Sequence, residues 1–81
     1  MDINVGDWFM CEAQNLYASI SSVDEVSLEV EADVFEIFVS THLWCGEDTF
    51  VVKKHSNSNV CIYDTHGNEF IKTNDNPLHD D

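Results

Sequence analysis

The choice between a helical and an all-strand beginning of this chain depends on residues 7–20, which read DWFMCEAQNLYASI. Apolar side chains recur there with the spacing of one face of an α-helix, and Asp7 is placed as its N-cap. The apolar positions are Phe9, Ala13, Leu16, Tyr17 and Ile20. A strand beginning at Trp8 would alternate its side chains over four residues, but the alternation fails at residues 15–17. We therefore predict a helix over residues 7–20.

Residues 22–32 fit two kinds of structure. Ser22 and Glu25 have the spacing of a capping box, which would begin a second short helix. However, apolar and polar residues alternate over residues 26–33, which is an equally clean strand pattern. The sequence leaves this segment open between helix and strand.

The rest of the chain has short segments rich in β-branched and aromatic residues, separated by turn-forming Asn, Ser and Gly. The predicted strands are residues 34–40, 49–54, 59–64 and 68–72. Strands joined by hairpins run antiparallel, so we expect an α+β fold with an antiparallel sheet of four or five strands and one or two helices. A small all-β barrel is the alternative. The expected core includes Phe9, Leu16, Ile37, Val39, Val52 and Ile62.

The length of 81 residues fits one small hydrophobic core. We expect a single acidic domain over residues 1–72, followed by a flexible acidic tail over residues 73–81. No apolar run approaches the ~20 residues that span a bilayer. The three cysteines are an odd number and no signal-like segment follows Met1, so we expect free thiols in the cytoplasm of a bacterial host cell.

Net charge is the most unusual property of the chain. Sixteen Asp and Glu stand against three Lys and no Arg, which gives a formal net charge of −13. This balance excludes direct binding to nucleic acid or to an anionic membrane, because both are approached with basic residues. Carboxylates repeated along a strand or helix resemble a row of phosphates, so we expect a basic nucleic-acid-binding protein as the partner.

Motifs for catalysis are weak. There is no glycine-rich phosphate loop, no basic cluster and no nucleophile elbow, so we predict no enzymatic turnover, no catalytic residue and no cofactor. A zinc site is an alternative, because two thiols and two imidazoles could close a tetrahedron if their loops meet. Its ligands would be His42, Cys45, Cys61 and His66. Free cysteines and surface histidines explain the same residues, and we predict no required metal.

Five segments also carry a resemblance to a known family. They are residues 4–9 with Glu12, residues 18–20, residues 23–26, residues 36–41 and residues 60–69. In this order they resemble the first helix, first strand, acidic second helix, second strand and last hairpin of the phage inhibitors of uracil-DNA glycosylase. The resemblance implies a DNA mimic that enters the DNA groove of the enzyme. Where that family has an acidic residue in its first strand, this chain has Ala18.

The resemblance implies that Asp24 and Glu25 face the groove of the enzyme, beside a pocket that receives an apolar side chain. That pocket would be lined by Val26, Val30, Val39 and Val51. We predict a partner-binding site made of acids flanking a valine patch. Its residues are Asp24, Glu25, Glu29, Glu31, Val26 and Val30.

Other small acidic proteins rely on the same attraction. Immunity proteins neutralise nuclease toxins by covering a basic active site, and anti-restriction and anti-CRISPR proteins act on host defence enzymes. A structural or zinc-binding adaptor and a homodimer are further alternatives.

Overall fold

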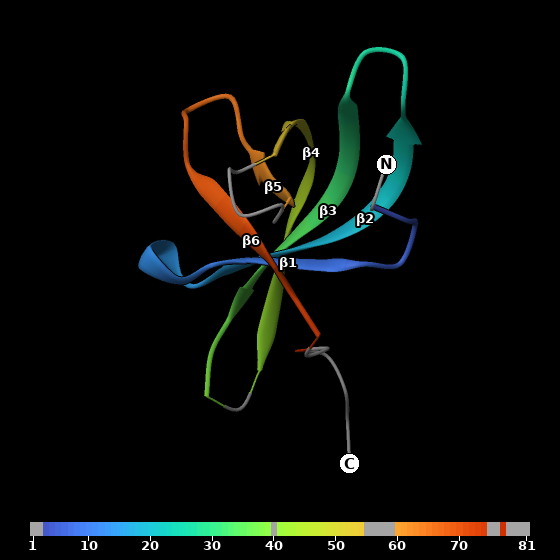
Figure 1. Ribbon diagram of the computed structural model, residues 1–81. Coiled ribbons are helices and arrows are strands. Elements are labelled where there is room, and N and C mark those ends of the chain that lie inside the picture. Colours follow the sequence, from blue (N-terminus) through green and yellow to red (C-terminus); the bar gives the residue numbers. More distant parts are fainter. Residues whose placement is uncertain (1–2, 40, 55–59, 75–76, 78–81) are drawn as a thin grey trace.

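The computed structural model describes residues 3–39, 41–54, 60–74 and 77, which form a closed antiparallel barrel of six strands (Figure 1). A short 3-10 helix, η1 (Glu12–Gln14), follows the first strand. The strands are β1 (Trp8–Cys11), β2 (Leu16–Asp24), β3 (Glu29–Ile37), β4 (His42–Lys54), β5 (Val60–Tyr63) and β6 (Glu69–Thr73). Each strand pairs with the next one along the chain, and β6 pairs with β1 to close the barrel.

The predicted helix over residues 7–20 is wrong, and with it the predicted α+β class. No α-helix occurs in the part of the chain that the structure describes, so the all-β barrel is the correct alternative. Residues 7–20 hold two strands that fold back on each other, with Phe9 opposite Ala18. The apparent helical stripe arose because residues of two strands and of η1 were counted as one series. Phe9 and Ile20 are buried in the barrel, whereas Ala13 is exposed on η1.

Asn15 provides the reversal between these strands. Its backbone has φ 54° and ψ 39°, the left-handed conformation that asparagine accepts more readily than most residues. The Asn15 side-chain amide donates a hydrogen bond to the Ile37 carbonyl oxygen, which ties the turn to the end of β3. The break in alternation at residues 15–17 therefore marked a turn between two strands.

Residues 22–32 form a strand, a turn and a second strand. β2 ends at Asp24, whose carboxylate accepts hydrogen bonds from the backbone N–H groups of Val26, at 3.0 Å, and Ser27, at 3.3 Å. Leu28 has φ 59°, and β3 begins immediately after it. Asp24, which lies between the predicted capping residues Ser22 and Glu25, thus stabilises a hairpin turn. The second helix expected from the capping box and from the resemblance is absent from this segment.

The barrel interior is built from alternate residues of the strands. Three phenylalanines fill most of it, and small residues such as Ala18 and Ala32 leave room for them. Phe50 and Phe70 meet edge to face, with ring centroids 5.0 Å apart. The main buried cluster is Ile3, Phe9, Cys11, Ala18, Ile20, Val30, Ala32, Val34, Phe50, Ile62 and Phe70.

The predicted core is confirmed only in part. Phe9 and Ile62 are fully buried, and Leu16 and Val52 pack against the buried cluster. Ile37 is half-buried and Val39 is fully exposed, because they lie where the β3–β4 hairpin extends beyond the interior. Figure 1 shows this hairpin (green) reaching to the end opposite the β2–β3 turn (teal).

The β5–β6 hairpin is closed by a turn built around Asp64. Its carboxylate accepts hydrogen bonds from the backbone N–H groups of His66 and Asn68, at 2.9 and 2.8 Å, and Gly67 supplies φ 84°. Burial raises the pKa of Asp64, but the hydrogen bonds from Asn68 and His66 outweigh it, and the net shift is downward. Beside this turn the Tyr63 hydroxyl donates a hydrogen bond to the Glu69 carboxylate.

The hydrogen bond to Glu69, together with burial, raises the pKa of Tyr63 to about 12. An unfolded tyrosine ionises near pH 10. Folding therefore favours the neutral phenol, so this stabilisation is complete below about pH 10 and is lost as pH rises through about 12. We expect Glu69→Ala to lower the pKa of Tyr63, measured by phenolate absorbance in a Tyr17→Phe background. An unchanged titration curve would mean that the hydrogen bond to Glu69 does not raise the pKa of Tyr63.

The predicted tail begins inside the sheet, since Thr73 is the last residue of β6 and pairs with Trp8. Residues 75–76 and 78–81 of that tail lie outside the described residues. Among the residues that the structure describes, no helical segment has the length and hydrophobicity required to cross a bilayer.

Candidate functional site

Carboxylates gather on the outer surface of three adjacent strands. On β3, Glu29, Glu31 and Asp33 alternate with the buried residues Val30 and Ala32, so the three acids point outward. The register places Asp24 of β2 opposite Glu29, and Glu47 of β4 opposite Asp33. We call this surface the acidic face, and its members are Asp24, Glu29, Glu31, Asp33 and Glu47.

The acidic face has a charge density close to that of nucleic acid. Four residues of strand separate Glu29 from Asp33, a length of about 14 Å, and neighbouring strands lie about 4.8 Å apart. One strand of DNA carries about four phosphates over the same length. Five carboxylates on three strands therefore present a comparable number of negative charges on a rigid surface.

The three lysines lie at the end of β4 and on β6. Lys72 on β6 forms an ion pair with Asp7 at 3.3 Å, and the Lys53 ammonium lies 5.0 Å from the centroid of the Tyr63 ring. Lys53 and Lys54 are paired in register with β5. Within the described residues, which include all three lysines of the chain, no lysine is paired in register with a member of the acidic face. The acidic face therefore has no cationic cross-strand partner.

Asp24 is both a member of the acidic face and the structural acid of the β2–β3 turn. Backbone hydrogen bonds from Ser27 and Val26 lower the pKa of its carboxyl group. The turn therefore keeps Asp24 ionised to lower pH than an ordinary aspartate. The same hydrogen bonds fix the position of the charge before any partner binds.

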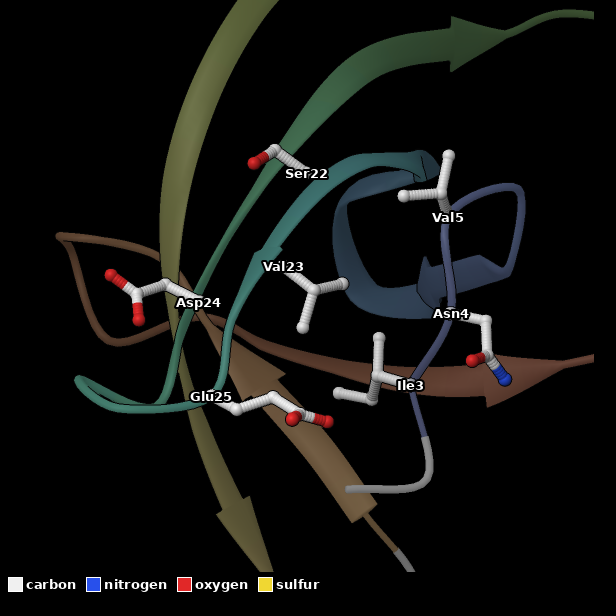
Figure 2. Close-up of a pocket in the computed structure, with 7 residues that line it drawn as sticks. All are labelled: Ile3, Asn4, Val5, Ser22, Val23, Asp24 and Glu25. Carbon is white, nitrogen blue, oxygen red and sulfur yellow. The ribbon is translucent and has the colours of Figure 1, made fainter.

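A hollow with a volume of about 570 Å³ lies beside this hairpin (Figure 2). Its walls come from the N-terminal segment and from the end of β2. The lining residues are Ile3, Asn4, Val5, Ser22, Val23, Asp24 and Glu25. In Figure 2 the side chains of Ile3 and Val23 point toward each other, whereas the Asp24 carboxylate points to the other side of the strand. The hollow joins an apolar floor to an acidic rim.

A smaller hollow of about 180 Å³ lies on the other side of the hairpin. It is lined by Ser22, Asp24, Ser27, Glu29, Val30, Glu31 and Thr49. Four of the six predicted site residues, Asp24, Glu29, Glu31 and Val30, therefore line it, and Glu25 lines the larger hollow instead.

The predicted valine patch does not exist as a surface. Val30 is part of the barrel core, and Val26 stands alone at the tip of the turn with 96% of its surface exposed. Val39 lies beyond the opposite end of β3, and Val51 pairs with Glu29 on the outer surface. The apolar contact surface beside the acids comes from Val5 and Val23 instead, and the buried Ile3 lines the same hollow. The sequence reading missed this surface because its residues come from separate segments.

The four predicted zinc ligands are not brought together. His42 and Cys45 lie near the start of β4, whereas Cys61 is in β5 and His66 is in the turn that follows it. β4 pairs with β5 only from Val51 onward, so neither His42 nor Cys45 lies opposite Cys61, whose partner in register is Lys53. In the part of the chain that is described, no three His, Cys, Asp or Glu side chains are arranged to hold a metal ion.

An aromatic surface was also missed by the sequence reading. Trp8, Tyr17, Phe35 and Trp44 lie on the outer surfaces of four consecutive strands, adjoining the acidic face at Asp33. Trp8, Tyr17 and Phe35 each stand next to a buried residue, which was a usable signal, but Trp8 and Tyr17 had been assigned to a helix. Trp44 has exposed neighbours and gave no such signal.

No protein-family model, curated protein or solved structure matches this chain.

Proposed function

We propose that this protein is an acidic DNA mimic that binds the nucleic-acid groove of a DNA-binding enzyme and blocks it. The observation that supports the proposal is the clustering of charge: five carboxylates lie together on β2, β3 and β4, and in the part of the chain that the structure describes no lysine is paired in register with any of them. It acts stoichiometrically, with no turnover and no cofactor. We place this activity in the cytoplasm of a bacterial host, where the thiols of Cys11, Cys45 and Cys61 stay reduced.

Two physical effects combine in this binding mode. A negative surface meeting a groove shaped for phosphates is attracted over long distances, which increases the association rate by about 10- to 1000-fold. Charge alone does not select one basic protein from another. The hollow beside the acids, with Ile3 and Val23 at its floor, is the place where an apolar side chain of the partner slows dissociation.

Uracil-DNA glycosylase is the first enzyme to test, because segments of the sequence resemble its phage inhibitors. The helices that this resemblance implied are replaced by strands here, so the proposal depends on the surface charge and not on a shared fold. Host defence nucleases and nuclease toxins have the same basic grooves, and an immunity protein against a toxin would use the same face.

Competition with DNA is the direct test. Purified protein is added to a glycosylase, a restriction nuclease and a toxin nuclease, each bound to a fluorescent DNA duplex. We expect displacement of DNA from at least one enzyme at a one-to-one ratio, weakening as salt shortens the Debye length from about 10 Å at 0.1 M to 3 Å at 1 M.

A pull-down from bacterial lysate at low and high salt extends this test to enzymes that were not chosen in advance. Recovery of a DNA-binding enzyme that DNA competes away is the expected result. If the protein displaces DNA from none of the enzymes and none is recovered, the mimic proposal is wrong.

A further inference from the structure

The acidic face continues along β3 into an aromatic surface on the same side of the barrel. Phe35 lies two residues beyond Asp33 and is opposite both Tyr17 of β2 and Trp44 of β4. Trp8 lies on β1, on the other side of β2, and its ring packs against the ring of Phe35. We call Trp8, Tyr17, Phe35 and Trp44 the aromatic face.

Two rings of this face, those of Trp8 and Phe35, pack against each other. The centroids of Trp8 and Phe35 are 5.7 Å apart with a tilt of 43°, and His42 meets Phe35 edge to face at 5.9 Å. Trp44 is different, because 59% of its surface is exposed. Its indole N–H donates a hydrogen bond of 3.2 Å to the Asp33 carboxylate, which holds the ring in place at the border with the acidic face.

We propose that the aromatic face binds an arginine side chain of the basic partner, with the guanidinium stacked on Trp44 and its charge matched by Asp33 and Glu47. This inference rests on the proposed function and identifies the chemistry of the partner at this surface. A guanidinium is planar and weakly hydrated, so it can stack on an indole and donate hydrogen bonds to a carboxylate at its edge. A carboxylate accepts up to about four hydrogen bonds, so Asp33 can serve both Trp44 and the arginine.

Charge favours this occupant over the other candidates. A second copy of the chain would bring together two molecules of net charge −13. An apolar segment would cover Asp33 and Glu47 without neutralising them, and removing carboxylates from water without a partner is costly. An arginine can stack on the exposed Trp44 ring and neutralise the adjacent carboxylates.

The indole N–H signals of the two tryptophans provide the readout, in protein labelled with nitrogen-15. Three short peptides are titrated that differ at one position, which is arginine, lysine or the uncharged isostere citrulline. We expect the arginine peptide to shift the Trp44 indole signal most and to bind most tightly, and the citrulline peptide to leave the signal almost unchanged. Trp44→Ala should weaken arginine-peptide binding about 5- to 30-fold, because a cation over an indole contributes about 1–2 kcal/mol.

Two further variants separate stacking from general effects. Trp44→Phe should retain part of the affinity, since it keeps an aromatic ring. Val51→Ala removes another exposed apolar side chain of β4 and should leave the affinity unchanged. Equal binding of arginine and citrulline peptides, or equal binding by Trp44→Ala, would overturn the inference.

The two proposals fail in different ways. If Trp44→Ala neither weakens the arginine peptide nor the enzyme complex, while charge reversal on β3 weakens the complex, the arginine inference is wrong and the mimic proposal stands. If arginine peptides bind at Trp44 but no DNA-binding enzyme is displaced from DNA, the inference stands and the mimic proposal is wrong.

Discussion

Phe50→Ala is expected to remove a large share of the folding stability of this protein. Phe50 is 1% exposed and packs edge to face on Phe70 in the barrel interior. Truncation of a buried phenylalanine costs about 3–5 kcal/mol, because the lost transfer free energy adds to the cost of the cavity. At about 0.05–0.15 kcal/mol per residue, a chain of this length has a total stability of only about 4–12 kcal/mol.

Urea denaturation followed by circular dichroism measures this effect. Phe50→Leu keeps most of the side-chain volume and should unfold at a midpoint between those of wild type and Phe50→Ala. The matched control is Val39→Ala, an apolar truncation at a fully exposed position, which should change stability by less than about 0.5 kcal/mol. A loss at Val39 as large as that at Phe50 would show that the β3–β4 hairpin is packed differently from the structure.

Reversing two charges on the acidic face should have the largest effect on partner binding. The double variant Glu29→Lys with Glu31→Lys places two cations where the proposed groove meets β3. Steering accounts for about 10- to 1000-fold in association rate, so we expect a loss within this range at low salt. The loss should shrink at high salt, where exposed charges are screened, and the dissociation rate should change less.

A single-charge comparison separates position from net charge. Glu31→Lys and Glu12→Lys change the net charge equally, but Glu31 lies on the acidic face and Glu12 lies on η1. Surface plasmon resonance against the enzyme recovered in the competition test gives the association rates. If both variants slow association equally, the net charge acts as a whole and the acidic face has no special role.

The acidic face shows where sequence reasoning succeeded. Glu29 and Glu31 were predicted as acids flanking Val26 and Val30. The strand alternation, one of the two patterns found in residues 22–32, places both acids outside the barrel and Val30 and Ala32 inside. The position of Glu47 opposite Asp33 could not be predicted from alternation along one strand. It depends on the register between β3 and β4, which includes a bulge after Val34.

The first hairpin shows where local patterns misled. Phe9, Leu16 and Ile20 have helical spacing, and both a helix and a hairpin would bury Phe9 and Ile20. The difference is the conformation of a single residue, Asn15, which turns the chain so that β1 and β2 pair. Local propensity is a weak preference, and pairing with β6 and β3 on either side overrides it.

By itself, the sequence determined the strongly acidic character of this protein and the strands over residues 49–54, 60–63 and 69–72, because these depend on composition and on two-residue alternation. Only the tertiary structure decided that residues 7–20 are strands, that Val30 is core, and that Ile3 and Val23 face each other beside the acids. Closing a barrel requires β1 to pair with β6, across more than 60 residues of chain. Such contacts join residues that no local pattern connects, and they fix which side of each strand is buried.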